Sequence, residues 1–189
     1  PRGLTAEDLV AFERVSSPLL SPDGKRVVYA LREADVAANK AVTSLWIQSL
    51  DGKAPPRRLT AASASAVSPQ FSADGAALYF LSPRSGSMQV WRLPLSGGEA
   101  QAVSDYPLDV GSYRVSPDGN TLAFSLEVFN DCPDLACSTK RLADAAAKKS
   151  TGVLYERLFV RHWDTWADGR RSQLFTAPID ARGRAADVP

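Results

Sequence analysis

The sequence predicts an all-β fold built from repeated units, and three observations support this prediction. The same turn phrase occurs three times, each time followed by an apolar run: Ser21-Pro22-Asp23-Gly24, Ser72-Ala73-Asp74-Gly75 and Ser116-Pro117-Asp118-Gly119. The serines of successive copies are 51 and 44 residues apart, close to the roughly 40–50 residues of one β-propeller blade. A second motif, an aromatic residue in a strand that runs into a Gly or Pro turn, recurs at Trp46, Trp91 and Phe175. We therefore expect a β-propeller with about three blades of a larger ring, an N-terminal helix and a helical insertion in blade three.

Residues 1–14 are expected to form a helical arm ahead of the first blade. Thr5 is suited to the N-cap, and Asp8, three residues later, can reach back to complete a capping box. Leu9 and Phe12 fall on one face of this helix. We expect that face to pack against the first blade.

Blade one is expected at residues 15–62 and blade two at residues 63–106. In each, Asp-Gly reverses the chain between two strands, since Gly readily adopts a positive φ. A loop is expected at residues 33–43 of blade one. Short segments at residues 57–60 and 101–104 are suited to outer edge strands, which are brief in propellers.

The aromatic residues of the second motif, Trp46 and Trp91, recur with the period of the blades. This recurrence favours packing in the core between blades over stacking on a ligand.

Blade three is expected at residues 107–189, incomplete and interrupted by an insertion at residues 127–157. The insertion contains an Ala-rich helical pattern, with Ser138 or Thr139 as its cap and lysines in its last turn. The aromatic segment that follows is expected to form the first limb of a hairpin that turns at Asp168-Gly169. The chain stops where blade three should add its outer strand, and a ring needs about four to eight blades. We therefore expect this chain to be part of a larger polypeptide or assembly.

Composition narrows the class of protein. Of 189 residues, 44% are hydrophobic, and 22 basic against 21 acidic residues give a net charge of +1. The basic residues are scattered, so we expect no nucleic-acid partner. Because no apolar run approaches about 18 residues, we also expect no membrane partner.

The two cysteines, Cys132 and Cys137, are separated by four residues. A local disulfide, two free buried thiols and a metal site are the alternatives, and the disulfide is favoured. A zinc site needs about four ligands, and the chain has a single histidine, His162. A disulfide would place the chain in an oxidising compartment, periplasmic or secreted.

The repeated hairpins resemble the N-terminal propeller of the prolyl oligopeptidase family of serine peptidases. The segment at residues 158–175, with Arg161-His162-Trp163-Asp164-Thr165-Trp166 at its centre, looks like the corresponding segment of bacterial peptidases of the dipeptidyl peptidase five and acylaminoacyl peptidase types. The cysteine loop also looks like those of periplasmic members. The resemblance implies a C-terminal α/β-hydrolase domain with a Ser-Asp-His triad elsewhere in the polypeptide. It also implies that the propeller filters substrates and helps to hold the peptide N-terminus.

We expect no catalytic residue within this chain. A hydrolase of that kind needs a Gly-x-Ser-x-Gly elbow, and the sequence contains none. The nearest approximations, around Gly86 and Gly97, are typical of turns. His162 could act as a general base beside Asp164, but no nucleophile accompanies them. No phosphate loop, nucleotide fingerprint or calcium loop occurs, so no cofactor is expected.

The candidate substrate-binding residues carry charge or an aromatic ring. A peptide amine needs a carboxylate, and a peptide carbonyl or carboxylate needs a cationic fork. The candidates are Glu127, Glu156, Arg157, Arg161, His162 and Trp163. The alternatives are solvated charges or structural ion pairs for the charged residues, and a packed polar-aromatic junction for residues 161–166.

The resemblance and the residues together indicate the substrate-gating propeller portion of a serine exopeptidase, dipeptidyl or acylaminoacyl, that hydrolyses short peptides. The expected partners are the remainder of the same polypeptide and short peptide substrates, and homo-oligomerisation stays open. The alternative is a non-enzymatic, TolB-like periplasmic propeller scaffold. A scaffold of that kind should lack the insertion that carries the cysteines, the helix and the aromatic segment.

Overall fold

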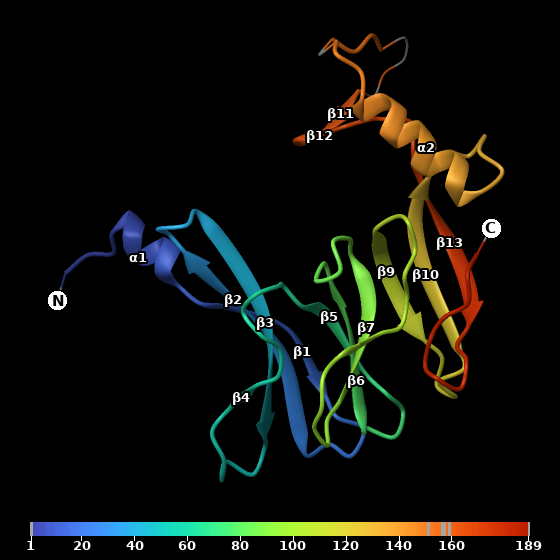
Figure 1. The fold of residues 1–189 in the computed structure, drawn as a ribbon. Helices are drawn as coiled ribbons and strands as arrows, with labels where there is room; N and C mark the ends of the chain where they lie inside the picture. Colours follow the sequence, from blue (N-terminus) through green and yellow to red (C-terminus); the bar gives the residue numbers. More distant parts are fainter. Residues whose placement is uncertain (1, 151, 156–157, 159, 189) are drawn as a thin grey trace.

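A computed structural model describes residues 2–150, 152–155, 158 and 160–188 (Figure 1). Within these residues the strands form antiparallel sheets in the orders β1-β2-β3-β4, β5-β6-β7-β8 and β9-β10-β13, and a small hairpin, β11-β12. The first two sheets follow the chain strand by strand, and the insertion separates β10 from β13. The expected all-β propeller architecture is therefore confirmed, as an open run of blades. The elements are α1 (Ala6–Ala11), β1 (Arg14–Leu20), β2 (Arg26–Asp35), β3 (Lys40–Ser49), β4 (Arg57–Arg58), β5 (Val67–Phe71), β6 (Ala77–Ser82), β7 (Gln89–Pro94), β8 (Gln101–Ala102), β9 (Val110–Val115), β10 (Thr121–Val128), α2 (Leu135–Ala146), β11 (Arg161–His162), β12 (Thr165–Trp166) and β13 (Arg171–Pro178).

The repeated phrase forms the same turn in each blade. In blade two, the Ser72 hydroxyl accepts from the Ala77 N–H at 2.9 Å and donates to Asp74 Oδ1 at 2.6 Å. The Asp74 carboxylate also accepts from the Ala76 N–H at 2.9 Å. These hydrogen bonds, the serine hydroxyl first, lower the pKa of Asp74 below its usual range. The same hydrogen bonds recur around Asp23 and Asp118.

A β-bulge precedes the turn in the first two blades. Ser17 and Ser68 adopt left-handed φ values of 50° and 54°, and the register of β1 with β2 and of β5 with β6 shifts at these points. Each serine stands four residues before the serine of its turn and is followed by proline. This Ser-Pro pair is part of the repeat and was not anticipated from the sequence.

The hydrophobic core lies between successive sheets. Strand β6 is buried along its whole length, because its two faces serve two interfaces. Leu78 and Phe80 belong to the cluster with β2 and β3, while Tyr79 and Leu81 belong to the cluster with β9 and β10. The two blade interfaces therefore share one central strand.

The three aromatic residues of the second motif each lie opposite another aromatic residue on the neighbouring strand. Trp46 lies opposite Tyr29, Trp91 opposite Phe80, and Phe175 opposite Phe124. Trp91 packs against the cluster between blades one and two, as expected. Trp46 is half-buried and lies beneath the guanidinium of Arg58, 5.3 Å from the ring centre.

The N-terminal helix is confirmed, but its packing is not. Thr5 and Asp8 form the expected capping box. However, the described structure buries no residue of α1, and Leu9 and Phe12 are each 51% exposed. The helix lies beside the end of the β2–β3 hairpin (Figure 1) and leaves its apolar face to solvent.

Two further expectations about local structure are wrong. Strands β2 and β3 stay paired through Asp35 and Lys40, so most of the expected loop at residues 33–43 is regular hairpin. Helix α2 is capped by Asp134, so it begins about one turn earlier than a cap at Ser138 or Thr139 would give. It ends at Ala146, before the lysines that were expected in its last turn. The Asp134 carboxylate accepts from the Cys137 N–H at 2.7 Å, and an aspartate is as good an N-cap as a serine.

The outer strands β4 and β8 are two residues long, as expected for propeller edges. None of the helices in the described part of the chain is long and apolar enough to cross a membrane.

Candidate functional site

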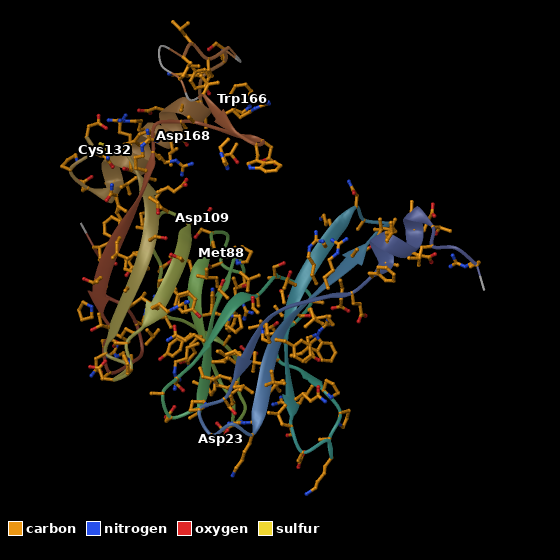
Figure 2. The ribbon with its side chains drawn as sticks, turned by 180° about the vertical axis from the view of Figure 1, so that it is seen from behind. Asp23, Met88, Asp109, Cys132, Trp166 and Asp168 are labelled. Carbon is orange, nitrogen blue, oxygen red and sulfur yellow. A yellow bond between two sulfur atoms is a disulfide. The ribbon has the colours of Figure 1, made fainter. Side chains whose placement is uncertain are left out.

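The insertion extends from one end of blade three. It leaves at the end of β10 and returns at the start of β13, where Val128 lies opposite Arg171. Figure 2 shows Cys132, Trp166 and Asp168 at this end of the sheets, and Asp23 of a repeated turn at the opposite end. The site described below is therefore built on the side away from the repeated turns.

Helix α2 is fixed to the blade over its first turns. Leu135 joins the core cluster between blades two and three. Ser138 is fully buried, and its hydroxyl accepts from the Phe129 N–H at 3.3 Å. A disulfide between Cys132 and Cys137 closes the segment in front of the helix. The local disulfide, which the sequence favoured over free thiols and a metal site, is thus present in the structure.

An aromatic ring couples the helix to the returning chain. The Arg141 guanidinium lies 4.5 Å from the centre of the Phe129 ring and pairs with both oxygens of Asp131 at 2.8 and 2.9 Å. This pairing lowers the pKa of Asp131. Gly169 has a φ of +97°, and a Cβ at this position would lie 3.4 Å from the Phe129 ring. The turn at Gly169 therefore favours glycine for its backbone conformation, and a Cβ there would only be in ordinary contact with Phe129.

The aromatic segment forms its own small hairpin, so the expected hairpin turning at Asp168-Gly169 is wrong. Arg161 pairs with Trp166 and His162 with Thr165. The chain reverses at Trp163 and Asp164, with Trp163 in the left-handed region at a φ of 54°. Asp168-Gly169 instead leads directly into β13, where the Arg170 N–H donates to Asp168 Oδ1 at 3.0 Å.

Three stacked side chains stiffen this hairpin. The Arg161 guanidinium lies 5.2 Å from the centre of the Trp166 ring. The Tyr155 ring stacks on Trp166 with a centroid distance of 5.9 Å. Trp166 is nevertheless 57% exposed and Trp163 85% exposed. The alternative of a packed polar-aromatic junction is therefore not what the structure shows.

A cleft of about 340 Å³ lies between this hairpin and the end of blade three. One wall comes from β10 and the start of β13, and the other comes from the hairpin. The lining residues are Glu127, Arg161, His162, Thr165, Trp166, Ala167, Asp168, Arg170 and Arg171.

Arg170 forms ion pairs with two carboxylates that line the cleft, Asp168 and Glu127. Arg170 bonds Asp168 Oδ2 through its Nε at 2.7 Å and reaches Glu127 Oε2 at 3.5 Å. The structural ion pair considered for Glu127 thus exists, although the glutamate side chain keeps most of its surface exposed. The exposed carboxylate of Glu127 can accept further hydrogen bonds, since an ionised carboxylate offers about four acceptor positions.

The predicted candidates fall into three groups. Glu127, Arg161 and His162 line the same cleft. Trp163 projects from the hairpin turn and does not line it. Glu156 and Arg157 lie outside the described residues. Arg170 and Asp168 were missed, and the sequence signal that could have found them is the Asp-Gly-Arg turn directly before a strand that pairs with Glu127.

The cleft offers carboxylates, guanidiniums and an aromatic wall, which is a combination suited to a zwitterionic peptide. It offers no serine or cysteine nucleophile among its lining residues. In the part of the chain that the structure describes, no three His, Cys, Asp or Glu side chains gather in a way that could hold a metal ion.

Comparisons with known proteins agree with this architecture. The family model of PD40, the TolB beta propeller domain, matches residues 6–143. The chain is 32% identical over 167 residues to dipeptidyl-peptidase 5 of Porphyromonas gingivalis, covering 87% of this chain and 23% of that protein. It is 30% identical over 165 residues to dipeptidyl-peptidase 5 of Porphyromonas endodontalis, with the same coverage. The chain thus spans about a quarter of the length of these relatives.

Solved structures show the same fold at low sequence identity. The AtxE2 isopeptidase superposes with a TM-score of 0.66 and 22% identity, over 97% of this chain and 32% of that one. Pyrococcus horikoshii acylaminoacyl peptidase superposes with a TM-score of 0.64 and 17% identity, over 95% of this chain and 25% of that one.

Proposed function

The chain belongs to the TolB β-propeller family, and from this premise we propose that it is the substrate-gating propeller portion of a serine exopeptidase that cleaves short peptides. The peptidase relatives support this proposal, because the chain matches only the part of each that corresponds to a propeller. Catalysis would then reside in sequence outside these residues. We propose the helical arm at residues 1–14 and the blades at residues 15–62, 63–106 and 107–189 as the units of this portion.

The observation that carries the proposal is the cleft that brings Glu127, Arg161 and Trp166 together beside the end of blade three. In the proposed complex, the Glu127 carboxylate accepts from the free amine of the peptide. The Arg161 guanidinium donates to a peptide carbonyl, and the Trp166 ring contacts an apolar side chain. Each contact is a charge-assisted or aromatic interaction of the kind that fixes a ligand's orientation.

A propeller can support peptide hydrolysis without supplying a reacting group. Holding the N-terminal end of the peptide fixes its register and lowers the entropic cost of reaching the attack geometry. Confinement beside the blades also excludes folded proteins. Both effects act on substrate binding and selection, and the proposed acyl transfer to serine and then to water takes place elsewhere.

The disulfide supports a periplasmic or secreted location for this peptidase. Disulfides persist in oxidising compartments and are rare in reducing ones, and the pair Cys132–Cys137 is formed here.

The role of Glu127 is testable by steady-state kinetics of the full-length protein. Two chromogenic substrates are compared, a dipeptide with a free amine and the same dipeptide with an acetylated amine. We expect Glu127→Gln to raise KM for the free-amine substrate about tenfold, because an amine–carboxylate hydrogen bond is charge-assisted. The acetylated substrate should be affected much less.

Glu99→Gln is the matched control, since Glu99 is an exposed glutamate of blade two away from the cleft. It should leave both substrates unchanged. An equal loss on both substrates with Glu127→Gln would mean that Glu127 acts on folding or on chemistry rather than on the amine.

A further inference from the structure

A second cleft lies at the N-terminal side of blade one and is distinct from the site beside the insertion. It has a volume of about 470 Å³ and is lined by residues of α1, the start of β1 and the tip of the β2–β3 hairpin. Figure 1 shows α1 beside this end of the hairpin. Its lining residues are Val10, Phe12, Arg14, Arg32, Ala34, Asp35, Val36, Asn39, Lys40 and Ala41. Its size falls within the roughly 300–1,000 Å³ of small-molecule sites.

Two arginines lie side by side in the lining of this cleft. Arg14 of β1 is the direct register partner of Arg32 of β2, so their side chains share one face of the sheet. Like charges at directly opposed positions destabilise an antiparallel pair. The arrangement therefore costs stability unless an anion lies between the two guanidiniums.

Two carboxylates of neighbouring segments pair with other arginines. Glu33 pairs with Arg58, and Asp8 pairs with Arg2. Asp35 lines the cleft as well, with its Oδ1 accepting from the Ala38 N–H at 3.0 Å, and it is the one carboxylate among the lining residues. Across the described residues, neither Arg14 nor Arg32 takes part in an ion pair, and Lys40 adds a third cation to the lining.

An apolar wall adjoins the three cations. Val10 and Phe12 are 47% and 51% exposed, and Val36 is 68% exposed. A ligand that covers exposed apolar side chains beside a cleft gains binding free energy from their burial. This lining has three cations against the single carboxylate of Asp35, whereas the cleft beside the insertion has three arginines against the two carboxylates of Glu127 and Asp168.

We propose that this cleft binds an amphipathic carboxylate. The carboxylate lies between Arg14 and Arg32, whose planar guanidiniums match its geometry, and its apolar group covers Val10 and Phe12. This site is independent of the substrate cleft proposed above, and a peptide C-terminus or a fatty acid carries the required chemistry.

Calorimetric titration of the full-length protein tests the site with two matched pairs of probes. N-acetylphenylalanine and its amide differ only in the carboxylate, as do octanoate and octanamide. We expect each acid to bind at least about tenfold more tightly than its amide, because hydrogen bonds to a charged group are the strong ones. The tighter of the two acids identifies the source of the ligand, peptide or fatty acid.

Variants locate the binding. Arg14→Gln and Arg32→Gln should each weaken binding of the acid about tenfold or more, while Arg57→Gln, an exposed arginine of β4, and Arg161→Gln, in the other cleft, should not. In the ligand-free protein, Arg32→Gln should leave Tm unchanged or raise it, because it removes a like-charge pair. Absence of saturable binding by both acids, equal binding of acid and amide, or binding insensitive to both cleft arginines would each overturn the proposal.

Discussion

Each repeated turn depends on a serine hydroxyl that accepts a backbone N–H and donates to an aspartate. The turn is completed by a glycine in the left-handed region, at φ values of +68°, +67° and +75° for Gly24, Gly75 and Gly119. Gly75 differs from the other two in its surroundings. A Cβ there would lie 3.3 Å from Pro22 Cδ of the preceding blade's turn, whereas Gly24 and Gly119 face open space.

Substitution of these glycines separates backbone strain from contact between blades. Gly119→Ala should destabilise the protein by about 1–2 kcal/mol, the cost of a left-handed residue with a Cβ. Gly75→Ala should cost more, because Pro22 must also move. Urea unfolding followed by tryptophan fluorescence measures both, and an equal loss at the two positions would contradict the contact.

The turn aspartates predict a specific response to acid. Hydrogen bonds from serine hydroxyls and backbone N–H groups lower the pKa of Asp23, Asp74 and Asp118 in the folded chain. Their stabilising effect is therefore complete above the unfolded-state pKa of about 4 and is lost as the pH falls through the lowered folded-state pKa.

Asp118→Asn should make the decline of stability in acid shallower, since the amide does not titrate. Asp105→Asn, at an exposed aspartate, is the control and should leave the decline as it is. Urea midpoints between about pH 2 and pH 6 cover the relevant range, and parallel curves for the two variants would show that the turn carboxylate does not contribute.

Among the elements, the insertion combines a helix packed against blade three with an exposed hairpin. The disulfide and the Asp134 cap hold the start of α2, and Leu135 and Ser138 bury it against blade three. The hairpin β11–β12 has no buried residue. The hairpin therefore borders the cleft without enclosing it.

Removal of the disulfide should act locally. The two cysteines are five positions apart, and closing so short a loop contributes about 2 kcal/mol in the chain-entropy account. The double variant Cys132→Ser, Cys137→Ser should speed amide exchange in α2 and leave exchange in β6 unchanged. Faster exchange in β6 would show instead that the insertion supports the blades.

Most of the repeated elements could be predicted from the sequence, and the unique ones could not. Ser72-Ala73-Asp74-Gly75 predicts its hairpin because serine, aspartate and glycine each have one local function there. The hairpin at Arg161 could not be placed, because its turn uses Trp163 in a left-handed conformation that tryptophan seldom adopts. The cleft partner Arg170 was missed for a similar reason, since its closeness to Glu127 depends on the pairing of β10 with β13.

At the scale of the whole molecule, the blades form one continuous stack through β6. Side chains also join blades directly: the Gln70 amide bonds both the N–H and the carbonyl of Val115, at 3.1 and 2.9 Å, and the Tyr113 hydroxyl donates to the Ser68 carbonyl at 2.8 Å. Burial raises the pKa of Tyr113 well above its usual value, which favours the protonated hydroxyl that donates this hydrogen bond. The insertion joins this stack through Leu135, which lies in the core cluster between blades two and three.

We have proposed that this propeller serves a serine peptidase. Its most direct test is to treat the full-length protein with a fluorophosphonate that labels active serines, map the adduct by mass spectrometry, and assay hydrolysis of short peptides. We expect hydrolysis together with an adduct on the serine of a Gly-x-Ser-x-Gly segment outside residues 1–189. A full-length protein with neither adduct nor hydrolysis would contradict it and would favour a non-enzymatic, TolB-like scaffold.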